Sequence, residues 1–432
     1  MQLNAILNKI GFEIYSFGQL FDSEERGMGF MSGSAVRTDV IFRTLKAQHE
    51  TQQPLLMKIN SALNPGVPPY LPVERFNDDF GSYYWIPKLV TAFNLKYPGR
   101  VAAHFYLFIS LIASIVLFLG LRRICKGIHW LFIFSLALGT FFFSLFFLDV
   151  YIANYAGVAM IPLAFWFSKD IVKTKKWGLI FIVSLGLIIV SGFLESVRSL
   201  STVPFWIFLA TFFTLKIPGW KGLMASLGLV IATLLLSIGV RIAFFYPIQA
   251  RRDLWLSTQN WPTSSGLLAS HAIWHNAYIG LGFLKGNPYG IVAGDSSGWR
   301  RAKEIQPTLS YFWFARGYAL TDSTYEKTIK TEFFKILLES PWFVTKTFIL
   351  KLVEALRRGL VFSIIGWICC YRFFLKRRLS VLEVFPFAAA GAFTLAPAVW
   401  FLPNDSYLLG YYLICIVFTV FALSQWKEER RA

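Results

Sequence analysis

The fold of this chain is decided by an apolar stretch that reads AHFYLFISLIASIVLFLGL over residues 103–121. It is followed by the basic residues Arg122, Arg123 and Lys126, and then by a second apolar run over 128–148. A helix needs about 20 apolar residues to cross the hydrocarbon core of a bilayer, and both runs have this length. The sequence therefore predicts two membrane-spanning helices joined by a short basic turn.

Further apolar runs follow the same pattern along the chain. Together they give about nine predicted spans: 103–121, 128–148, 150–168, 177–194, 203–215, 222–245, 359–375, 381–402 and 406–425. The composition agrees, because 56% of the 432 residues are hydrophobic and only 15% are charged, whereas a soluble domain is about one-quarter charged. We therefore expect an all-α polytopic membrane protein.

Basic residues collect at every second junction between the predicted spans. The basic junctions carry Arg122, Arg123 and Lys126; Lys169, Lys173, Lys175 and Lys176; Lys216 and Lys221; Arg372, Lys376, Arg377 and Arg378; and Lys427, Arg430 and Arg431. The short junctions between them carry Asp149, Glu195 with Arg198, and Asp405. Because basic junctions stay on the cytoplasmic side, this alternation predicts a cytoplasmic C-terminus and two large segments on the outer face.

These boundaries divide the chain into five parts. They are an outer segment over 1–102, an N-terminal transmembrane bundle over 103–245, an outer loop domain over 246–358, C-terminal transmembrane helices over 359–425 and a basic cytoplasmic tail over 426–432. The residues before position 22 are too polar for a signal peptide or a span. Since the outer segment must be exported, we expect that a first span precedes Met1; the alternative is that the span over 103–121 draws this segment across.

The net charge of +18 favours anionic lipid headgroups over nucleic acid as the partner of the basic residues, because these residues cluster at the ends of apolar runs. Membrane lipids are therefore expected partners, and no nucleic acid is expected. The sequence also contains no Gly-rich loop of the P-loop or Rossmann type, which disfavours a nucleotide-driven pump and cytosolic nucleotide-sugar chemistry.

An acidic pair, Asp78 and Asp79, lies near the end of the first outer segment and is followed by Gly81 and an aromatic cluster. Two adjacent carboxylates near a membrane can act as a general base with a supporting partner, or can bind a divalent cation. The alternative is a solvated turn, since Asn, Asp and Gly are typical turn residues. The pair is the candidate catalytic site, and no cofactor other than such a cation is expected.

The second outer segment contains a cluster of aromatic and polar residues: Trp274, His275, Asn276, Tyr278 and Asp295. Carbohydrate and headgroup sites combine aromatic faces with a few polar groups, so this cluster is a candidate for binding a polar ligand. His271 and His275 are one helical turn apart and could share a metal, but the sequence offers no identifiable third ligand. No metal site is therefore predicted.

Ionisable residues also lie at the outer ends of two predicted spans. Glu195 and Arg198 follow the fourth span, and Arg241 lies near the end of the sixth. An arginine at a membrane boundary suits a phosphate group, which makes all three candidates for substrate binding. The alternatives are an ion pair between Glu195 and Arg198, three residues apart on a helix, and an Arg241 side chain that extends to the lipid headgroups.

Apolar and charged residues alternate at helical spacing between Tyr325 and Trp342 and predict an amphipathic helix that ends at Pro341. This helix either lies on the membrane surface or packs on the outer domain.

The layout resembles the C-type glycosyltransferase superfamily (GT-C), whose members are integral membrane enzymes that share architecture more than sequence. In this superfamily an outer loop with an acidic motif precedes a span that returns to a basic cytoplasmic turn. Asp78-Asp79-Phe80-Gly81, the first span and Arg122-Arg123 are similar to that passage. The 325–342 helix is similar to the juxtamembrane helix that these proteins place before their C-terminal spans. The His271–Asp295 passage resembles one found in uncharacterised bacterial membrane proteins.

The resemblance implies a glycosyltransferase that takes a sugar from a polyprenyl-phosphate donor and transfers it to an acceptor of the cell envelope. Asp78 or Asp79 would be the base, and Arg198 or Arg241 would meet the lipid phosphate. The implied location is the bacterial inner membrane, with the reaction on its outer face. The alternatives are a transporter or flippase for a lipid-linked saccharide, and a non-catalytic envelope-assembly protein. Transport ranks second, because the sequence shows no internal repeat and few charges in mid-span.

Overall fold

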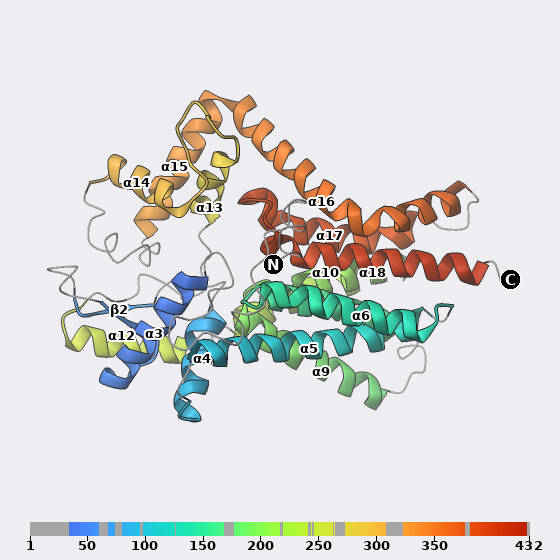
Figure 1. Ribbon diagram of the computed structural model, residues 1–432, viewed down its shortest axis with the longest axis horizontal. Helices are drawn as coiled ribbons and strands as arrows, with labels where there is room; N and C mark the ends of the chain where they lie inside the picture. The colour runs from blue at the N-terminus through green and yellow to red at the C-terminus, as the bar shows by residue number, and fades with distance from the viewer. Residues whose placement is uncertain are drawn as a thin grey trace, which may run out of the picture.

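The structure is a computed structural model of the chain. It describes residues 34–59, 68–73, 80–95, 98–125, 127–167, 177–216, 219–240, 243, 246–261, 263, 273–307, 323–375 and 381–429. Within these residues the chain forms helices and one short pair of strands, so the predicted all-α class is confirmed. The helices form an elongated bundle with two lobes at one of its ends (Figure 1).

The bundle contains the apolar helices. They are α5 (Pro98–Ile124), α6 (Trp130–Ser144), α7 (Ile152–Ala159), α8 (Ile161–Trp166), α9 (Trp177–Val197), α10 (Val203–Lys216), α11 (Trp220–Val240), the second half of α16 (Pro341–Leu375), α17 (Val381–Trp400) and α18 (Asp405–Glu429). Among the described residues, 3 stretches are long and apolar enough to cross a membrane: Pro98–Ile124, Trp130–Phe147 and Asp405–Lys427. Shorter apolar helices accompany them at Ile152–Trp166, Ile182–Val197, Val203–Leu215 and Val384–Trp400. These helices support an integral membrane protein, while the count of nine spans stays a prediction.

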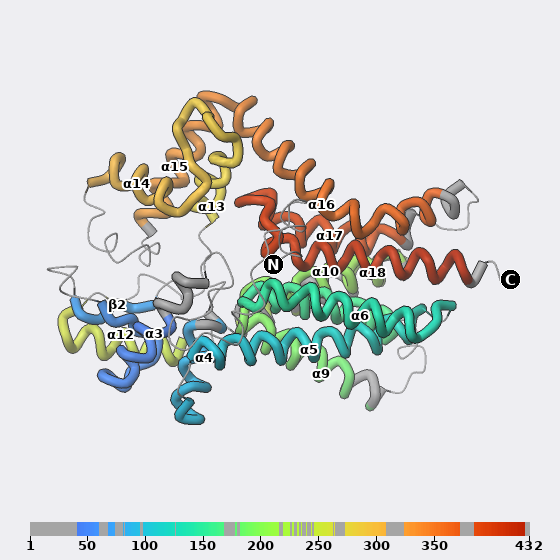
Figure 2. Tube along the Cα trace, in the orientation of Figure 1, coloured from blue at the N-terminus to red at the C-terminus, as the bar shows by residue number. Residues whose placement is uncertain are grey.

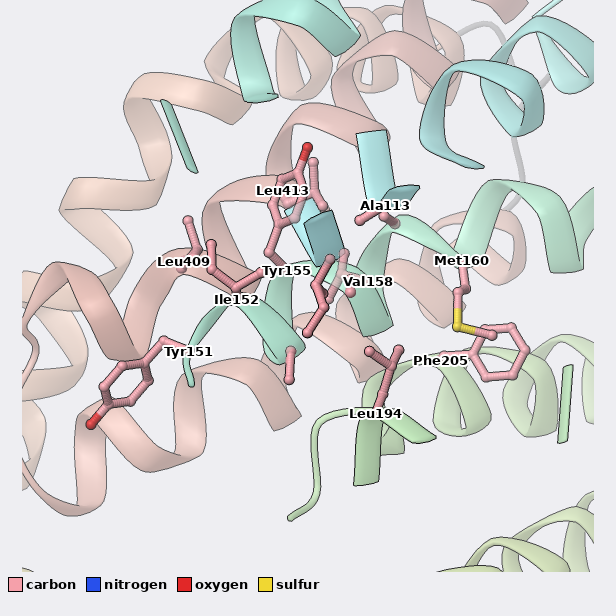
Figure 3. Close-up of a cluster of buried hydrophobic side chains, with 14 of the residues drawn as sticks. Ala113, Tyr151, Ile152, Tyr155, Val158, Met160, Leu194, Phe205, Leu409 and Leu413 are labelled. Atoms are coloured by element: carbon pink, nitrogen blue, oxygen red, sulfur yellow. The ribbon is translucent and has the colours of Figure 1, made fainter. Parts of the chain in front are cut away.

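The interior of the bundle is one buried cluster to which most of its helices contribute. Figure 3 shows side chains of α7, among them Ile152 and Tyr155, close to Leu409 and Leu413 of α18. Hydroxyl groups pair inside this apolar region. Ser114 Oγ lies 2.7 Å from the hydroxyl of Tyr155, which donates to Thr140 Oγ1 at 3.1 Å. Because lipid offers no hydrogen-bond partners, such pairs join α5, α6 and α7 from within.

The first lobe combines pieces from both long segments. It contains α3 (Ser34–Thr51), β1 (Leu56–Lys58), β2 (Tyr70–Pro72), α4 (Phe80–Ala92) and α12 (Tyr246–Thr258). The strands pair antiparallel, and α12 runs beside α3 although the two are far apart in the sequence (Figure 2). The side chain of Arg252 is fully buried and donates through Nη1 to the carbonyl oxygens of Leu55 and Val73, each at 3.2 Å. The start of the predicted 246–358 domain therefore packs with the first segment.

The second lobe contains α13 (Ile273–Gly280), the 3₁₀ turn η5 (Leu281–Phe283), α14 (Asp295–Ile305) and α15 (Ser323–Glu339). The apolar face of α15, with Ile329 and Phe333, is buried against α13. This face of the 325–342 helix therefore packs within its own lobe, which was one of the two alternatives for this helix. The helix ends at Glu339, and Pro341 begins α16, because a proline is tolerated in the first turn of a helix.

Candidate functional site

A cavity of about 450 Å³ lies where the bundle meets the second lobe. We call it the bundle cavity. Its polar lining consists of Asn154, Arg198, Ser199, Asn276, Thr394 and Tyr407, and its apolar lining of Leu200, Pro204, Ile273, Phe393, Ala396, Pro397, Trp400, Phe401 and Gly410. A largely apolar chamber with a few convergent polar groups is typical of a site for an amphipathic small molecule.

Arg198 is the one charged side chain among the described residues that line the bundle cavity. It comes directly after α9 and is 4% exposed. Its guanidinium carbon lies 4.2 Å from the centroid of the Tyr151 ring. An arginine stacked on an aromatic face and shielded from water interacts strongly with an anion, because the low local dielectric leaves the charge poorly screened. The cavity therefore combines apolar walls with one buried positive charge.

Glu195 organises the turn that holds Arg198. Its buried carboxylate accepts hydrogen bonds from the backbone N–H of Leu200 at 2.8 Å and from the backbone N–H and Oγ1 of Thr202 at 2.9 and 2.7 Å. Leu200 has a φ of 64°, a left-handed conformation that a leucine rarely adopts. The three hydrogen bonds stabilise this tight turn, so the structure gives Glu195 a positioning role beside the cavity.

The candidate catalytic residues Asp78 and Asp79 lie outside the described residues, and so does Arg241. The helix that follows the acidic pair is described, however. A Cβ atom at Gly81, the second residue of α4, would lie 2.6 Å from the carbonyl oxygen of Val197. Only a glycine permits this approach, so the start of α4 packs directly on the last residue of α9.

A second contact holds the same two helices together. Trp85, one turn further along α4, donates through Nε1 to Ser196 Oγ at 3.0 Å. The ring of Trp85 also lies 6.1 Å, centroid to centroid, from that of Phe193. The N-terminal turn of α4 is therefore fixed against the C-terminal turn of α9, immediately before Arg198 in the sequence.

Helical geometry divides the cluster predicted around α13. Ile273 and Asn276, three residues apart, share the face that lines the bundle cavity. His275 and Tyr278 are 2% and 3% exposed and lie inside the second lobe. Trp274 packs on Trp400 with ring centroids 6.1 Å apart. Of the predicted ligand-binding residues on α13, Asn276 is therefore the one that lies in the same cavity as Arg198.

His275 links three helices of the second lobe. Its Nδ1 lies 2.5 Å from the hydroxyl of Tyr325, and its Nε2 lies 3.2 Å from Oδ1 of Asp295. Burial, with a smaller contribution from Glu326 and Asp295, raises the pKa of Tyr325 well above its usual value, so this hydroxyl keeps its proton. Because the carboxylate of Asp295 can only accept, Nε2–H donates to it, and in that neutral tautomer of His275 the Nδ1 atom accepts from the hydroxyl of Tyr325. Burial also raises the pKa of Tyr278 to about 12.

Lys351 is a buried residue that the sequence did not single out. Its Nζ donates to the carbonyl oxygens of Trp400 at 3.2 Å and Phe401 at 3.0 Å, and both of these residues line the bundle cavity. Burial lowers the pKa of Lys351 to about 7. In the sequence, Lys351 is the single lysine within the apolar run 347–353, and this pattern alone suggests a surface residue.

An ion-pair network lies next to this region at the start of α18. Arg358 donates through Nη1 to Oδ1 of Asp405 at 2.9 Å, and the hydroxyl of Tyr412 donates to the same oxygen at 2.6 Å. Arg358 also pairs with Glu354, one turn earlier on α16, at 2.8 Å. The network connects α16 and α18, and Tyr407, two residues after Asp405, lines the bundle cavity.

A divalent cation at Asp78 and Asp79 stays a prediction, because both residues lie outside the described part of the chain. Within that part, no group of three or more His, Cys, Asp or Glu side chains is placed to hold a metal ion.

No family model, curated protein or solved structure matches this chain. The fold and the cavity themselves define a helical membrane protein with a largely apolar chamber at one end of its bundle, and with one arginine in that chamber.

Proposed function

We propose that this chain is a membrane glycosyltransferase that transfers a sugar from a polyprenyl-phosphate donor to an acceptor of the cell envelope. One observation carries the proposal: the buried Arg198 lines a largely apolar cavity and directly follows the residue, Val197, on which the helix of the acidic motif packs.

The bundle cavity offers the two surfaces that a lipid-phosphate donor requires. Arg198 would bind the phosphate through charge-assisted hydrogen bonds, which are stronger than those between neutral groups. The aromatic and aliphatic walls, such as Phe393 and Trp400, would take the first isoprene units. Asn154 and Asn276 supply carboxamides for sugar hydroxyls or phosphate oxygens.

The acidic pair is the proposed base. Asp79 is two residues before Gly81 in the sequence, and Gly81 is the residue of α4 that packs on Val197. A carboxylate there would take the proton of an acceptor hydroxyl. The acceptor oxygen then bonds to the anomeric carbon of the sugar while the bond from that carbon to the phosphate oxygen breaks. Arg198 would stabilise the negative charge of the departing polyprenyl phosphate.

The proposed orientation in the membrane follows from the distribution of basic residues. We infer about nine spans in a bacterial inner membrane, with the C-terminus in the cytoplasm and both lobes on the outer face. The arrangement in Figure 1 supports this orientation, because both lobes lie at one end of the bundle and the C-terminus at the other. The bundle cavity would then open at the outer membrane–water interface, where a polyprenyl phosphate presents its headgroup.

A flippase for a lipid-linked saccharide is the second candidate, and α17 favours it. This helix contains Pro386 and Pro397, and Pro397 lines the bundle cavity. A proline cannot donate to the carbonyl four residues earlier, here that of Phe393, so the continuous helix lacks one backbone hydrogen bond beside the cavity. Transporters commonly place broken helices at their substrate sites, and a weakened helical turn is a milder form of that feature.

One experiment separates these functions. Purified protein in detergent is supplied with a panel of radiolabelled polyprenyl-phosphate sugars and a crude envelope acceptor fraction, and the label that leaves the lipid is counted. In parallel, sealed proteoliposomes report whether the same lipids cross the bilayer. The proposal predicts release in detergent. Crossing without release would favour the flippase, and neither activity with any donor would favour a non-catalytic assembly protein.

A further inference from the structure

A second cavity, of about 530 Å³, lies in the first lobe between α3, α4 and α12. We call it the lobe cavity. Its polar lining consists of Gln48, Gln52, Tyr83, Tyr84, Lys88 and Arg251, and none of its lining residues also lines the bundle cavity. It therefore forms a separate site, built from residues of both long segments.

The charges in the lobe cavity are of one sign. Lys88 on α4 and Arg251 on α12 contribute positive charge, and no carboxylate is found among the described residues that line it. The Nζ of Lys88 donates to the hydroxyl of Tyr84 at 3.1 Å and lies 5.3 Å from the centroid of its ring. Two cations on different helices attract an anion between them, because each lacks a neutralising acid in the lining.

The backbone that lines the lobe cavity is fixed by its surroundings. Gln52 and Leu55 both have a φ of 57°, although neither is a glycine. Non-glycine residues persist in this conformation only where their surroundings enforce it. Here the fully buried Arg252 donates a hydrogen bond to the carbonyl oxygen of Leu55 at 3.2 Å. Tyr83, which is 1% exposed, lines the same cavity as Leu55. The carboxamide of Gln52 and the cation of Arg251 are thus presented from a fixed backbone.

We propose that the lobe cavity binds an anionic saccharide, a sugar that carries a carboxylate or a phosphate. Lys88 and Arg251 would pair with the acidic group, while Gln48 and Gln52 would hydrogen-bond hydroxyls and the ring of Tyr84 would stack on the sugar face. Tyr84 lies one turn after Gly81 on α4, so the same helix connects this cavity with the acidic motif. That the saccharide is the acceptor of transfer rests on the proposed function, whereas the binding site itself does not.

The test is direct binding to the full chain in phosphatidylcholine nanodiscs, measured by calorimetry without any donor. Trigalacturonate and glucose 1-phosphate are the acidic probes, and maltotriose is the neutral one. We expect at least one acidic probe to bind more tightly than maltotriose, with an affinity that falls as salt increases. The Lys88→Ala/Arg251→Ala variant should bind that probe about tenfold more weakly or worse, and Lys88→Arg/Arg251→Lys should retain binding.

A control variant, Lys285→Ala/Lys346→Ala, removes two exposed positive charges outside the first lobe and should leave the affinity unchanged. Nanodiscs with phosphatidylglycerol distinguish a lipid headgroup from a soluble sugar, because a headgroup in the site would compete with the soluble probe. The proposal is overturned if neither acidic probe binds, if maltotriose binds equally well, if both double-alanine variants weaken binding equally, or if phosphatidylglycerol abolishes it. Binding without transfer from any donor would reject the proposed function and keep this site.

Discussion

Gly81 and Val197 are in direct backbone contact. A Cβ atom at position 81 would lie 2.6 Å from the carbonyl oxygen and 2.7 Å from the Cα atom of Val197. Neither of these backbone atoms can rotate away as a side chain would. The contact therefore fixes the start of α4, where the acidic motif ends, against the residue that precedes Arg198.

Replacing Gly81 with alanine is expected to push α4 away from α9. An added methyl group in such a packed contact costs about 1–3 kcal/mol, and it would move the acidic motif relative to Arg198. We expect a lower melting temperature in detergent and a loss of label release of about tenfold or more. Gly139→Ala is the matched control, because a Cβ atom at that helical glycine meets no atom within 4 Å. If the two variants had the same melting temperature and the same label release, the contact between Gly81 and Val197 would not be important.

Arg198 is expected to control the affinity for the lipid phosphate. Arg198→Ala should weaken binding of polyprenyl phosphate by about tenfold or more, because it removes the charged lining residue of the bundle cavity. Arg198→Lys should restore part of the affinity, since a lysine keeps the charge but loses the planar pair of donors. Binding is measured by photo-crosslinking with a diazirine-bearing isoprenoid phosphate. Crosslinking that is unchanged in Arg198→Ala would place the phosphate elsewhere.

The second lobe is expected to depend on the hydrogen bond between Tyr325 and His275. Tyr325→Phe leaves the Nδ1 of the buried His275 without its donor, which costs about 1–3 kcal/mol of stability. We expect a lower melting temperature in detergent, and hydrogen exchange should show a loss of protection in α13. Tyr246→Phe serves as the control, because Tyr246 is 54% exposed. A Tyr325→Phe protein as stable as wild type would show that the bond contributes little.

Lys351 is expected to make stability depend on pH. It lies ahead of the predicted span over 359–375, and burial lowers its pKa to about 7 from the ordinary value of 10.5. Between these values the unfolded chain binds more protons than the folded chain, so the stability rises as pH increases from about 7 towards 10.5. Below about pH 7 the penalty for burying the charge is fully present.

The measurement is the melting temperature in detergent from about pH 6 to about pH 9. Wild type should gain stability relative to Lys351→Met as the pH rises, whereas the exposed Lys346→Met should follow wild type throughout. A constant difference between wild type and Lys351→Met would mean that Lys351 does not titrate in this range.

The apolar helices were predictable because a bilayer demands long runs that are visible in one dimension. The run 103–121 lies inside α5, and the run 406–425 lies inside α18. The predicted span at 359–375 is the second half of a longer helix, α16, which begins at Pro341. Its first half was hidden in the sequence because Lys351, Glu354 and Arg358 interrupt the apolar pattern. In the structure Lys351 donates to the carbonyl oxygens of Trp400 and Phe401, and Arg358 pairs with Glu354 on the same helix and with Asp405 of α18.

The candidate site was predictable only in part. Arg198 and Asn276 were both named from the sequence, and they line one cavity although they are far apart in the chain. The division of α13 into a cavity face and a buried face could not be predicted, because it depends on the contacts of His275 with Tyr325 and Asp295. The pairing of α12 with the first lobe through Arg252 was equally hidden, since a single arginine in sequence does not reveal which backbone carbonyls it will bind.

If the acidic pair performs sugar transfer from a donor held at Arg198, a mutation of the pair should abolish sugar release without abolishing lipid binding. Photo-crosslinking to the lipid phosphate and release of label from the matching donor are measured in parallel on wild type and on Asp78→Asn/Asp79→Asn. We expect the double variant still to bind the lipid but to release no label, because the proton acceptor is lost while Arg198 is intact. Full release by the double variant would rule out this catalytic role, and the acidic pair would then be a turn.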